Sequence, residues 1–243
     1  MLLPLYDTNR LHFIKFQAVT IGLILTNVAV FLFQQTLGEE NAAAFSIVGS
    51  FIPATLLLTG YVPNDAIALP AGWEFLPPSA TLITYMFVHG DFWHILGNMI
   101  FLWVFGDNVE DAMGHIRFLF FYLLCGIAAG LTHAVIDPGS ENPLLGASGA
   151  IAGVAAAYVL LYPKVRIWVL FLGRIPLPLP AYLVLGIWLA SQIAFIYFGD
   201  ESGTAWWAHL GGFAAGIVLL VPFKRSGMPL FGRAYPPDPV KQA

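Results

Sequence analysis

Residues 146–162 read GASGAIAGVAAAYVLLY. The stretch is almost entirely apolar, is rich in small residues and carries one small hydroxyl side chain, Ser148, near its start. It is long enough to form a helix buried in a membrane bundle. A polar side chain inside a bilayer costs free energy unless it has a partner, so such residues are rare and usually functional. Ser148 is therefore the first candidate functional residue of the chain.

The composition of the whole chain is that of a membrane protein. Its 243 residues are 58% hydrophobic and only 10% charged, whereas soluble domains are roughly 25% charged. The apolar segments follow each other with short gaps after residue 93, so we predict one domain, a helical bundle over residues 1–243. Six segments are apolar over about the 17 to 25 residues that a crossing helix needs, or slightly fewer. They are residues 13–35, 94–112, 116–136, 147–162, 178–198 and 206–223.

The lysines and arginines all fall on one side of this topology. These 10 residues lie before or at the start of the first segment, after the second, after the fourth, or in the tail. The connections 36–93, 137–146 and 199–205 contain none of them. Because positively charged loops remain in the cytoplasm, the pattern predicts that both termini are cytoplasmic, including a tail over 224–243. The first apolar segment is too long for a signal peptide and is predicted to be retained.

Two connections have unusual compositions. Residues 36–93 are rich in proline and in aromatic residues, which predicts either a segment lying in the outer membrane interface or a loop packed on the bundle. Residues 163–177 mix basic and apolar side chains and predict an interfacial anchor without chemistry of its own. Cys125 is the only cysteine, which excludes an intramolecular disulfide and a cysteine metal cluster.

Polar residues of three different segments are predicted to lie at the same depth. The second, fourth and sixth segments run in the same direction, and their first turns carry His94 and Asn98, Ser148, and His209 respectively. His94 and Asn98 are four residues apart and therefore share one face of a helix. Small residues recur every four positions in the fourth and sixth segments, which predicts that these two helices pack closely. These small residues are Gly149 and Gly153, and Ala208, Gly212 and Gly216.

This arrangement predicts nucleophilic catalysis. Ser148 is the candidate nucleophile and His209 the general base that takes its proton. Every Asp and Glu lies in a loop, at a segment edge or in the tail, so we predict a Ser/His dyad whose imidazole is oriented by helix packing. The backbone N–H of Ser148, the Asn98 amide and the His94 ring are the candidate oxyanion-hole donors. No metal or cofactor is implied, and the His-Glu-x-x-His motif of zinc proteases is absent from the sequence.

These motifs resemble those of the rhomboid family of intramembrane serine proteases, in particular its bacterial members. The sequence Gly146-Ala147-Ser148-Gly149 matches the family's Gly-x-Ser-Gly, and residues 94–98 match its His-x-x-x-Asn. Residues 208–216 match its Ala-His-x-x-Gly-x-x-x-Gly. In several rhomboids an aromatic residue four positions after the serine stacks on the histidine, but this chain has Ala152 there. Another group must therefore hold His209.

The resemblance implies an all-α, polytopic bundle of six transmembrane helices with a long first external loop. It implies an endopeptidase that acts through an acyl-enzyme on single-span membrane proteins in the bilayer, without a cofactor, a metal or nucleic acid. Ser148 and His209 would be the dyad, and His94, Asn98 and the Ser148 amide the oxyanion hole. The expected location is the cell membrane of a bacterium. Two other functions stay open: a catalytically inactive rhomboid-like binding protein, and a haem-binding or transport membrane protein.

Overall fold

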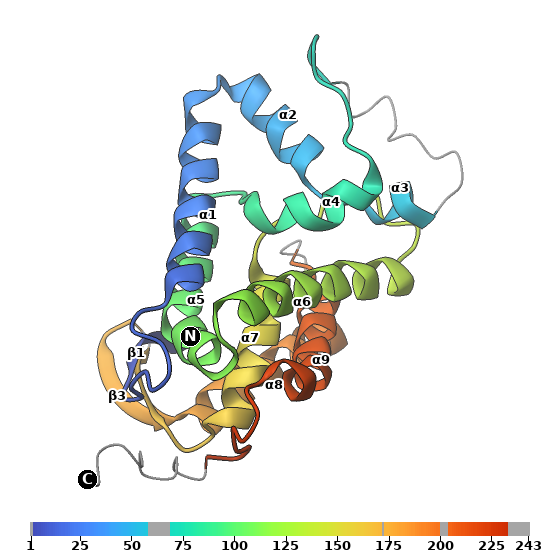
Figure 1. The fold of residues 1–243 in the computed structure, drawn as a ribbon. Coiled ribbons are helices and arrows are strands. Elements are labelled where there is room, and N and C mark those ends of the chain that lie inside the picture. The colour runs from blue at the N-terminus through green and yellow to red at the C-terminus, as the bar shows by residue number, and fades with distance from the viewer. Residues whose placement is uncertain (1, 58–68, 172, 200–203, 233–243) are drawn as a thin grey trace, which may run out of the picture.

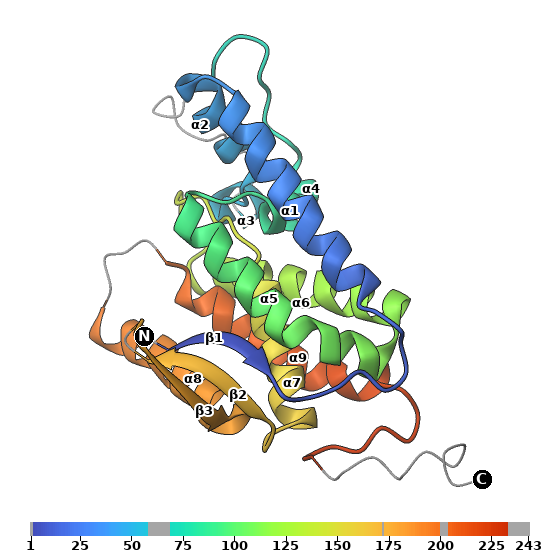
Figure 2. The ribbon, with the colours of Figure 1, turned by 90° about the vertical axis from the view of Figure 1, so that its left-hand side faces the viewer.

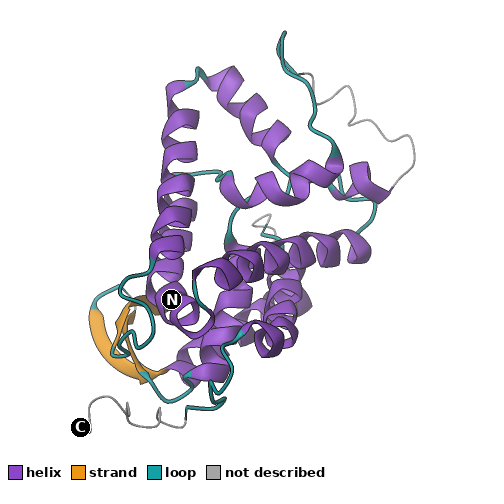
Figure 3. Ribbon diagram, viewed as in Figure 1, coloured by secondary structure: helices purple, strands orange, loops and turns teal. Residues whose placement is uncertain are grey.

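Helices make up most of the fold (Figure 3). The structure is a computed structural model that describes residues 2–57, 69–171, 173–199 and 204–232. A helix occupies most of each of the six apolar segments. These helices are α1 (Ala18–Thr36), α5 (Phe92–Met113), α6 (His115–Ile136), α7 (Ser148–Leu161), α8 (Ala181–Phe198) and α9 (Trp206–Phe223).

Four of these helices have the length and composition of membrane spans. Among the described residues, α1, α6, α8 and α9 are long and apolar enough to cross a bilayer. Helix α7 is shorter, with 14 residues, and α5 carries polar residues at both ends. A bundle with six crossings therefore stays a prediction.

Helix α7 is the central element of the bundle, in contact with α5, α6, α8 and α9 (Figure 2). Its residues 149–158 are all buried. The contact with α9 is made by backbone against backbone, because a Cβ atom on Gly212 would overlap the carbonyl oxygen of Gly149. A Cβ atom on Gly216 would overlap the carbonyl oxygen of Gly153 in the same way. The small residues therefore let two helices approach closely enough for short side chains to reach across.

The connection between α1 and α5 covers one end of the bundle (Figure 1). Its described part contains α2 (Glu39–Gly49), α3 (Pro53–Leu57), α4 (Pro78–Thr84) and a 3-10 turn over Tyr85–Phe87. Phe51 and Tyr85 are fully buried, and Phe51 pairs with Leu144 in an isolated β-bridge. The described part thus packs on the bundle, which was one of the two predicted arrangements. Pro63 of this connection lies outside the described residues.

Residues 163–177, predicted to be an interfacial anchor, contribute one strand and the start of another to a small sheet at the other end of the bundle (Figures 1 and 2), and their position in the membrane interface stays a prediction. The antiparallel sheet has the order β1 (Leu2–Asp7), β2 (Arg166–Phe171), β3 (Ile175–Pro180). Prolines occupy alternate positions of the edge strand β3, so their nitrogens all face one side. That side is the open edge, because proline has no N–H to donate to β2. Helix α8 consequently begins at Ala181, after the predicted 178.

The carboxylates at the end of α5 hold the start of α1 and the segment before it. Glu110 and Asp111 are buried. Glu110 accepts hydrogen bonds from the backbone N–H groups of Val19 and Thr20, at 2.9 and 2.7 Å. Asp111 accepts from the backbone N–H groups of residues 12, 13 and 14. Glu110 satisfies donors in the first turn of α1 and Asp111 satisfies donors in the segment before it. Both acids lie at the opposite end of α5 from His94, so they have a structural role.

Candidate active site

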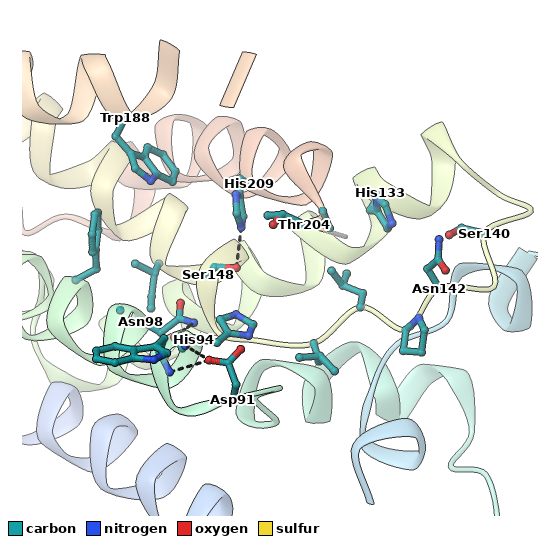
Figure 4. A pocket seen from close by; sticks show the side chains of 18 of the residues that line it. Asp91, His94, Asn98, His133, Ser140, Asn142, Ser148, Trp188, Thr204 and His209 are labelled. Carbon is teal, nitrogen blue, oxygen red and sulfur yellow. Dashed lines mark hydrogen bonds between the residues drawn. The ribbon is translucent and has the colours of Figure 1, made fainter. Parts of the chain in front are cut away.

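Ser148 and His209 are in direct contact. Ser148 is the first residue of α7 and His209 lies in the first turn of α9. The distance from His209 Nε2 to Ser148 Oγ is 2.7 Å, a normal hydrogen bond (Figure 4). His209 is buried, with 9% of its surface exposed. The close backbone packing of α7 and α9 thus brings the two predicted residues within hydrogen-bonding distance.

The loop before Ser148 is held by two hydrogen bonds. The Gly146 N–H donates to the Tyr85 carbonyl at 2.8 Å, and the Ala147 N–H donates to Nε2 of His89 at 3.4 Å. Burial lowers the pKa of His89 to about 3, so the ring is neutral and its Nε2 can accept a hydrogen bond. His89 therefore supports the loop that presents Ser148.

His94 lies against this loop because residue 146 is a glycine. Gly146 has φ +110, and a Cβ atom there would come within 2.6 Å of His94 Nε2. The start of α5, which carries His94, is capped by Asp91, whose carboxylate accepts from the N–H groups of Trp93 and His94 at 2.7 and 3.0 Å. The absence of a side chain at Gly146 therefore allows the imidazole to sit beside the loop that precedes Ser148.

Asn98 and His94 lie on the side of Ser148 away from His209 (Figure 4). Asn98 Nδ2 donates one hydrogen to the His94 carbonyl at 2.9 Å and has a second hydrogen for another acceptor. The Ser148 N–H is among the first N–H groups of α7, which have no partner within the helix and favour negative charge. All the predicted site residues thus gather at one place, and the oxyanion-hole role stays a prediction.

The four residues line one cavity of about 840 Å³. Its wall near α8 is apolar and includes Phe101, Ile151 and Trp188. Its other end is polar and includes His133 and Asn142 (Figure 4). The cavity is large enough to hold an extended peptide segment and water together. Among the residues that the structure describes, no group of three or more His, Cys, Asp or Glu side chains is arranged to hold a metal ion.

The structure adds a residue that the sequence analysis missed. The side-chain oxygen of Gln192, on α8, lies 2.7 Å from Nδ1 of His209, and Gln192 is only 3% exposed. The group beside Nδ1 is thus an amide on a third helix rather than a carboxylate, and its hydrogen bond adds to the helix packing that was predicted to orient the imidazole. A signal was present in the sequence, since an amide within an apolar segment is expensive to bury without a function.

Two tryptophans surround the His209 ring. Trp188 lies 6.0 Å from it between ring centroids, at an interplanar angle of 37°. Trp206 lies 5.7 Å away in an edge-to-face arrangement. The aromatic neighbours of the histidine thus come from α8 and α9, whereas α7 has the small residue Ala152 four positions after the serine.

Comparisons with known proteins agree with this fold. The Rhomboid domain family model matches residues 78–226, more than half of the chain. RHOMBOID-like protein 5 of Arabidopsis thaliana is 31% identical over 138 residues, covering 57% of this chain and 42% of the relative. Rhomboid protein 1, mitochondrial, of Saccharomyces cerevisiae is 29% identical, covering 62% of this chain and 46% of the relative. The chain therefore spans less than half the length of these two relatives. Rhomboid-like protease 3 of Toxoplasma gondii is 27% identical, covering 72% and 65% respectively.

Proposed function

Because the chain belongs to the rhomboid family, we propose that it is an intramembrane serine endopeptidase that cleaves other membrane proteins in or near their transmembrane segments. It is a mostly helical, multi-pass membrane protein, as predicted. The observation that carries the proposal is the 2.7 Å contact between Ser148 Oγ and His209 Nε2 inside a cavity of the bundle. The name of the Toxoplasma relative, a rhomboid-like protease, supports the same class of activity.

In the proposed acylation step, the Ser148 oxygen attacks the carbonyl carbon of the scissile peptide bond. His209 Nε2 accepts the hydroxyl proton as the C–O bond forms. The tetrahedral intermediate then loses its amine when the C–N bond breaks, and His209 returns the proton to the leaving nitrogen. The products of this step are the acyl-enzyme at Ser148 and the free amine of the C-terminal fragment.

In the deacylation step, water takes the place of the amine. His209 accepts a proton from the water as its oxygen attacks the ester carbon, and then returns that proton to Ser148 as the acid is released. In both steps the negative oxygen is stabilised by the Ser148 N–H, the Asn98 amide and the His94 ring, which lie beside the nucleophile. The polar end of the cavity, at His133 and Asn142, offers hydrogen-bonding groups for this water.

We also propose the membrane orientation that the basic residues predict. Both termini would be cytoplasmic, with the tail over 224–243 on the same side, so that the site opens outward. Residues 233–243 of that tail, with Arg233 and Lys241, lie outside the described residues. The bacterial inner membrane stays a prediction, because these three relatives come from a plant, a yeast and a protozoan parasite.

The other two functions are less well supported. An inactive binding protein would not need both Ser148 and His209, and here the two are hydrogen bonded. A haem-binding site would need free imidazole nitrogens aimed at one iron. Instead, Nε2 of His209 contacts Ser148 and its Nδ1 contacts Gln192, while the His94 ring lies against Gly146.

The test is cleavage of a reconstituted single-span membrane protein in liposomes. Wild-type protein should release a fragment and react with a fluorophosphonate probe, and mass spectrometry should find the adduct on Ser148. His209→Ala should lower both the cleavage rate and the labelling rate by about 10³-fold or more, because the hydroxyl loses its base. Absence of cleavage and labelling in the wild type, or uptake of haem with a shifted absorption band, would reject the proposal.

Asn98→Ala tests the oxyanion hole. We expect kcat to fall by about 10²-fold or more, since one such donor is worth roughly 2.7 to 4 kcal/mol of barrier. The fluorophosphonate labelling rate should fall too, because the adduct also places an oxygen in the hole. Gln35→Ala is the control, since it removes an exposed amide from α1 and should leave kcat unchanged. If Asn98→Ala turned over at the wild-type rate, the amide would have no such role.

A further inference from the structure

The hydrogen bonds that link Ser148 to His209 continue to a third residue, Gln192. We propose that Gln192 is a positioning residue that fixes the tautomer of His209, so that Nε2 is free to take the proton of Ser148. The inference rests on the proposed function, since it assigns His209 the role of base. It starts from the 2.7 Å contact between Gln192 Oε1 and His209 Nδ1.

The orientation of the Gln192 amide is set by its own helix. Its Nε2 donates to the Trp188 carbonyl at 2.9 Å and lies 2.9 Å from Ser191 Oγ. The Ser191 hydroxyl uses its own hydrogen on the same Trp188 carbonyl, at 2.6 Å, so it accepts from the amide. Both neighbours of the amide nitrogen are therefore acceptors. With the nitrogen turned to them, the side-chain oxygen faces His209.

This orientation determines where His209 carries its proton. A carboxamide oxygen can only accept, so Nδ1 of His209 must be the protonated nitrogen. A neutral imidazole has one proton, which leaves a lone pair on Nε2, the atom 2.7 Å from Ser148 Oγ. In the opposite tautomer, the lone pairs of Nδ1 and Oε1 would face each other and the serine proton would lose its acceptor. The chain of acceptors on α8 therefore selects the tautomer that can act as a base.

Water does not replace Gln192 readily at this position. The side chain is 3% exposed, and Trp188 and Trp206 flank the histidine ring. A neutral amide also avoids the cost of burying a carboxylate within the membrane. It orients the ring by one hydrogen bond, the task that an aspartate performs in soluble serine proteases. Gln192 thus gives His209 the support that the small side chain of Ala152 cannot provide.

The first test compares two substitutions of Gln192 in the liposome assay. Gln192→Leu removes the acceptor, and we expect kcat to fall by about 10- to 100-fold with KM changed by less than about threefold, in keeping with the loss of one buried hydrogen bond. Gln192→Glu keeps an acceptor and should retain at least about a tenth of wild-type kcat. A carboxylate beside the ring favours the imidazolium, so the acidic limb of the kcat/KM–pH curve should move to higher pH.

The control removes a comparable amide elsewhere. Gln34, on α1, is also buried and donates to Ser46 at 2.8 Å. Gln34→Leu should leave kcat within about twofold. An unchanged kcat in Gln192→Leu would overturn the proposal. It would also be overturned by an equal loss in Gln192→Leu and Gln192→Glu with no movement of the pH curve, which would indicate a packing defect only.

A second measurement does not depend on turnover. In nitrogen-15 NMR of histidine-labelled protein, with His209→Ala used for assignment, the wild type should show a protonated Nδ1 and an unprotonated Nε2 at His209. Gln192→Leu should show a mixture of the tautomers. A wild-type ring protonated at Nε2 would overturn the proposal directly. Failure of the proposed function has a different signature, because wild type and Ser148→Ala would then release equal product while His209 kept its proton on Nδ1.

Discussion

Ser148→Ala is expected to lower kcat for a reconstituted substrate by about 10⁴-fold or more, to the background of the assay. Without the Oγ atom no acyl-enzyme forms, and only binding and oxyanion stabilisation remain. Fluorophosphonate labelling should disappear completely. The fold should be unaffected, because the hydroxyl contacts His209 at the edge of the cavity and alanine is smaller than serine. The measurements are initial cleavage rates in liposomes together with thermal unfolding in detergent.

The double variant Ser148→Ala/His209→Ala makes this result more informative. Residues that act as one unit have effects that do not add, so the double variant should be no slower than Ser148→Ala alone. If the double variant instead lost the product of the two single fold-reductions, the two residues would act independently. Turnover by Ser148→Ala above about one per cent of wild type would identify another nucleophile and contradict the dyad.

Gly212→Ala is expected to have the largest effect on stability. Its Cβ atom would overlap the carbonyl oxygen of Gly149, a backbone atom that cannot turn away. Helices α7 and α9 would have to separate, and we expect the free energy of unfolding to fall by about 3 kcal/mol or more. Gly149 follows Ser148 in the sequence, so the same separation would move the Ser148 hydroxyl away from His209. A displacement of about 1 Å costs on the order of 10²-fold in rate, so activity should be lost even where protein stays folded.

Gly186→Ala is the matched control for this prediction. Gly186 also lies in the interior of a helix, α8, but a Cβ atom there meets nothing within 4 Å. Its substitution should change the free energy of unfolding by less than about 1 kcal/mol, the difference in helix propensity between the two residues. The two variants can be compared by denaturant unfolding in micelles. Equal stability of Gly212→Ala and Gly186→Ala would show that the close packing of α7 and α9 does not matter.

Much of the fold and of the site could be predicted from the sequence, because the membrane imposes strong and local rules. Long apolar segments predicted the helices, and small residues at four-residue spacing predicted the contact between α7 and α9. Ser148, His209, His94 and Asn98 were recognised because polar residues are rare in apolar membrane segments and usually have a function there. All four line the same cavity.

Other features depended on interactions between distant parts of the chain. The sheet at one end requires residues 2–7 to pair with residues 166–171, and neither strand shows a pattern that predicts this pairing. Glu110 and Asp111 are buried against N–H groups at the start of α1 and in the segment before it, about 90 to 100 residues away in the sequence. Local patterns predict elements, but partners far apart in the sequence have to be brought together by the fold.

For the proposed catalytic machinery, the amino-acid sequence was sufficient to name the candidate nucleophile, the candidate base and the candidate oxyanion donors, since their chemistry and depth follow from residue type and helix period. It was not sufficient to show how the base is oriented. That depends on the rotation of α8, which turns Gln192 toward His209 and leaves Gly186 on the exposed face. The rotation of a helix about its axis follows from side-chain packing among several helices. The sequence of one apolar segment with few polar residues does not determine that rotation.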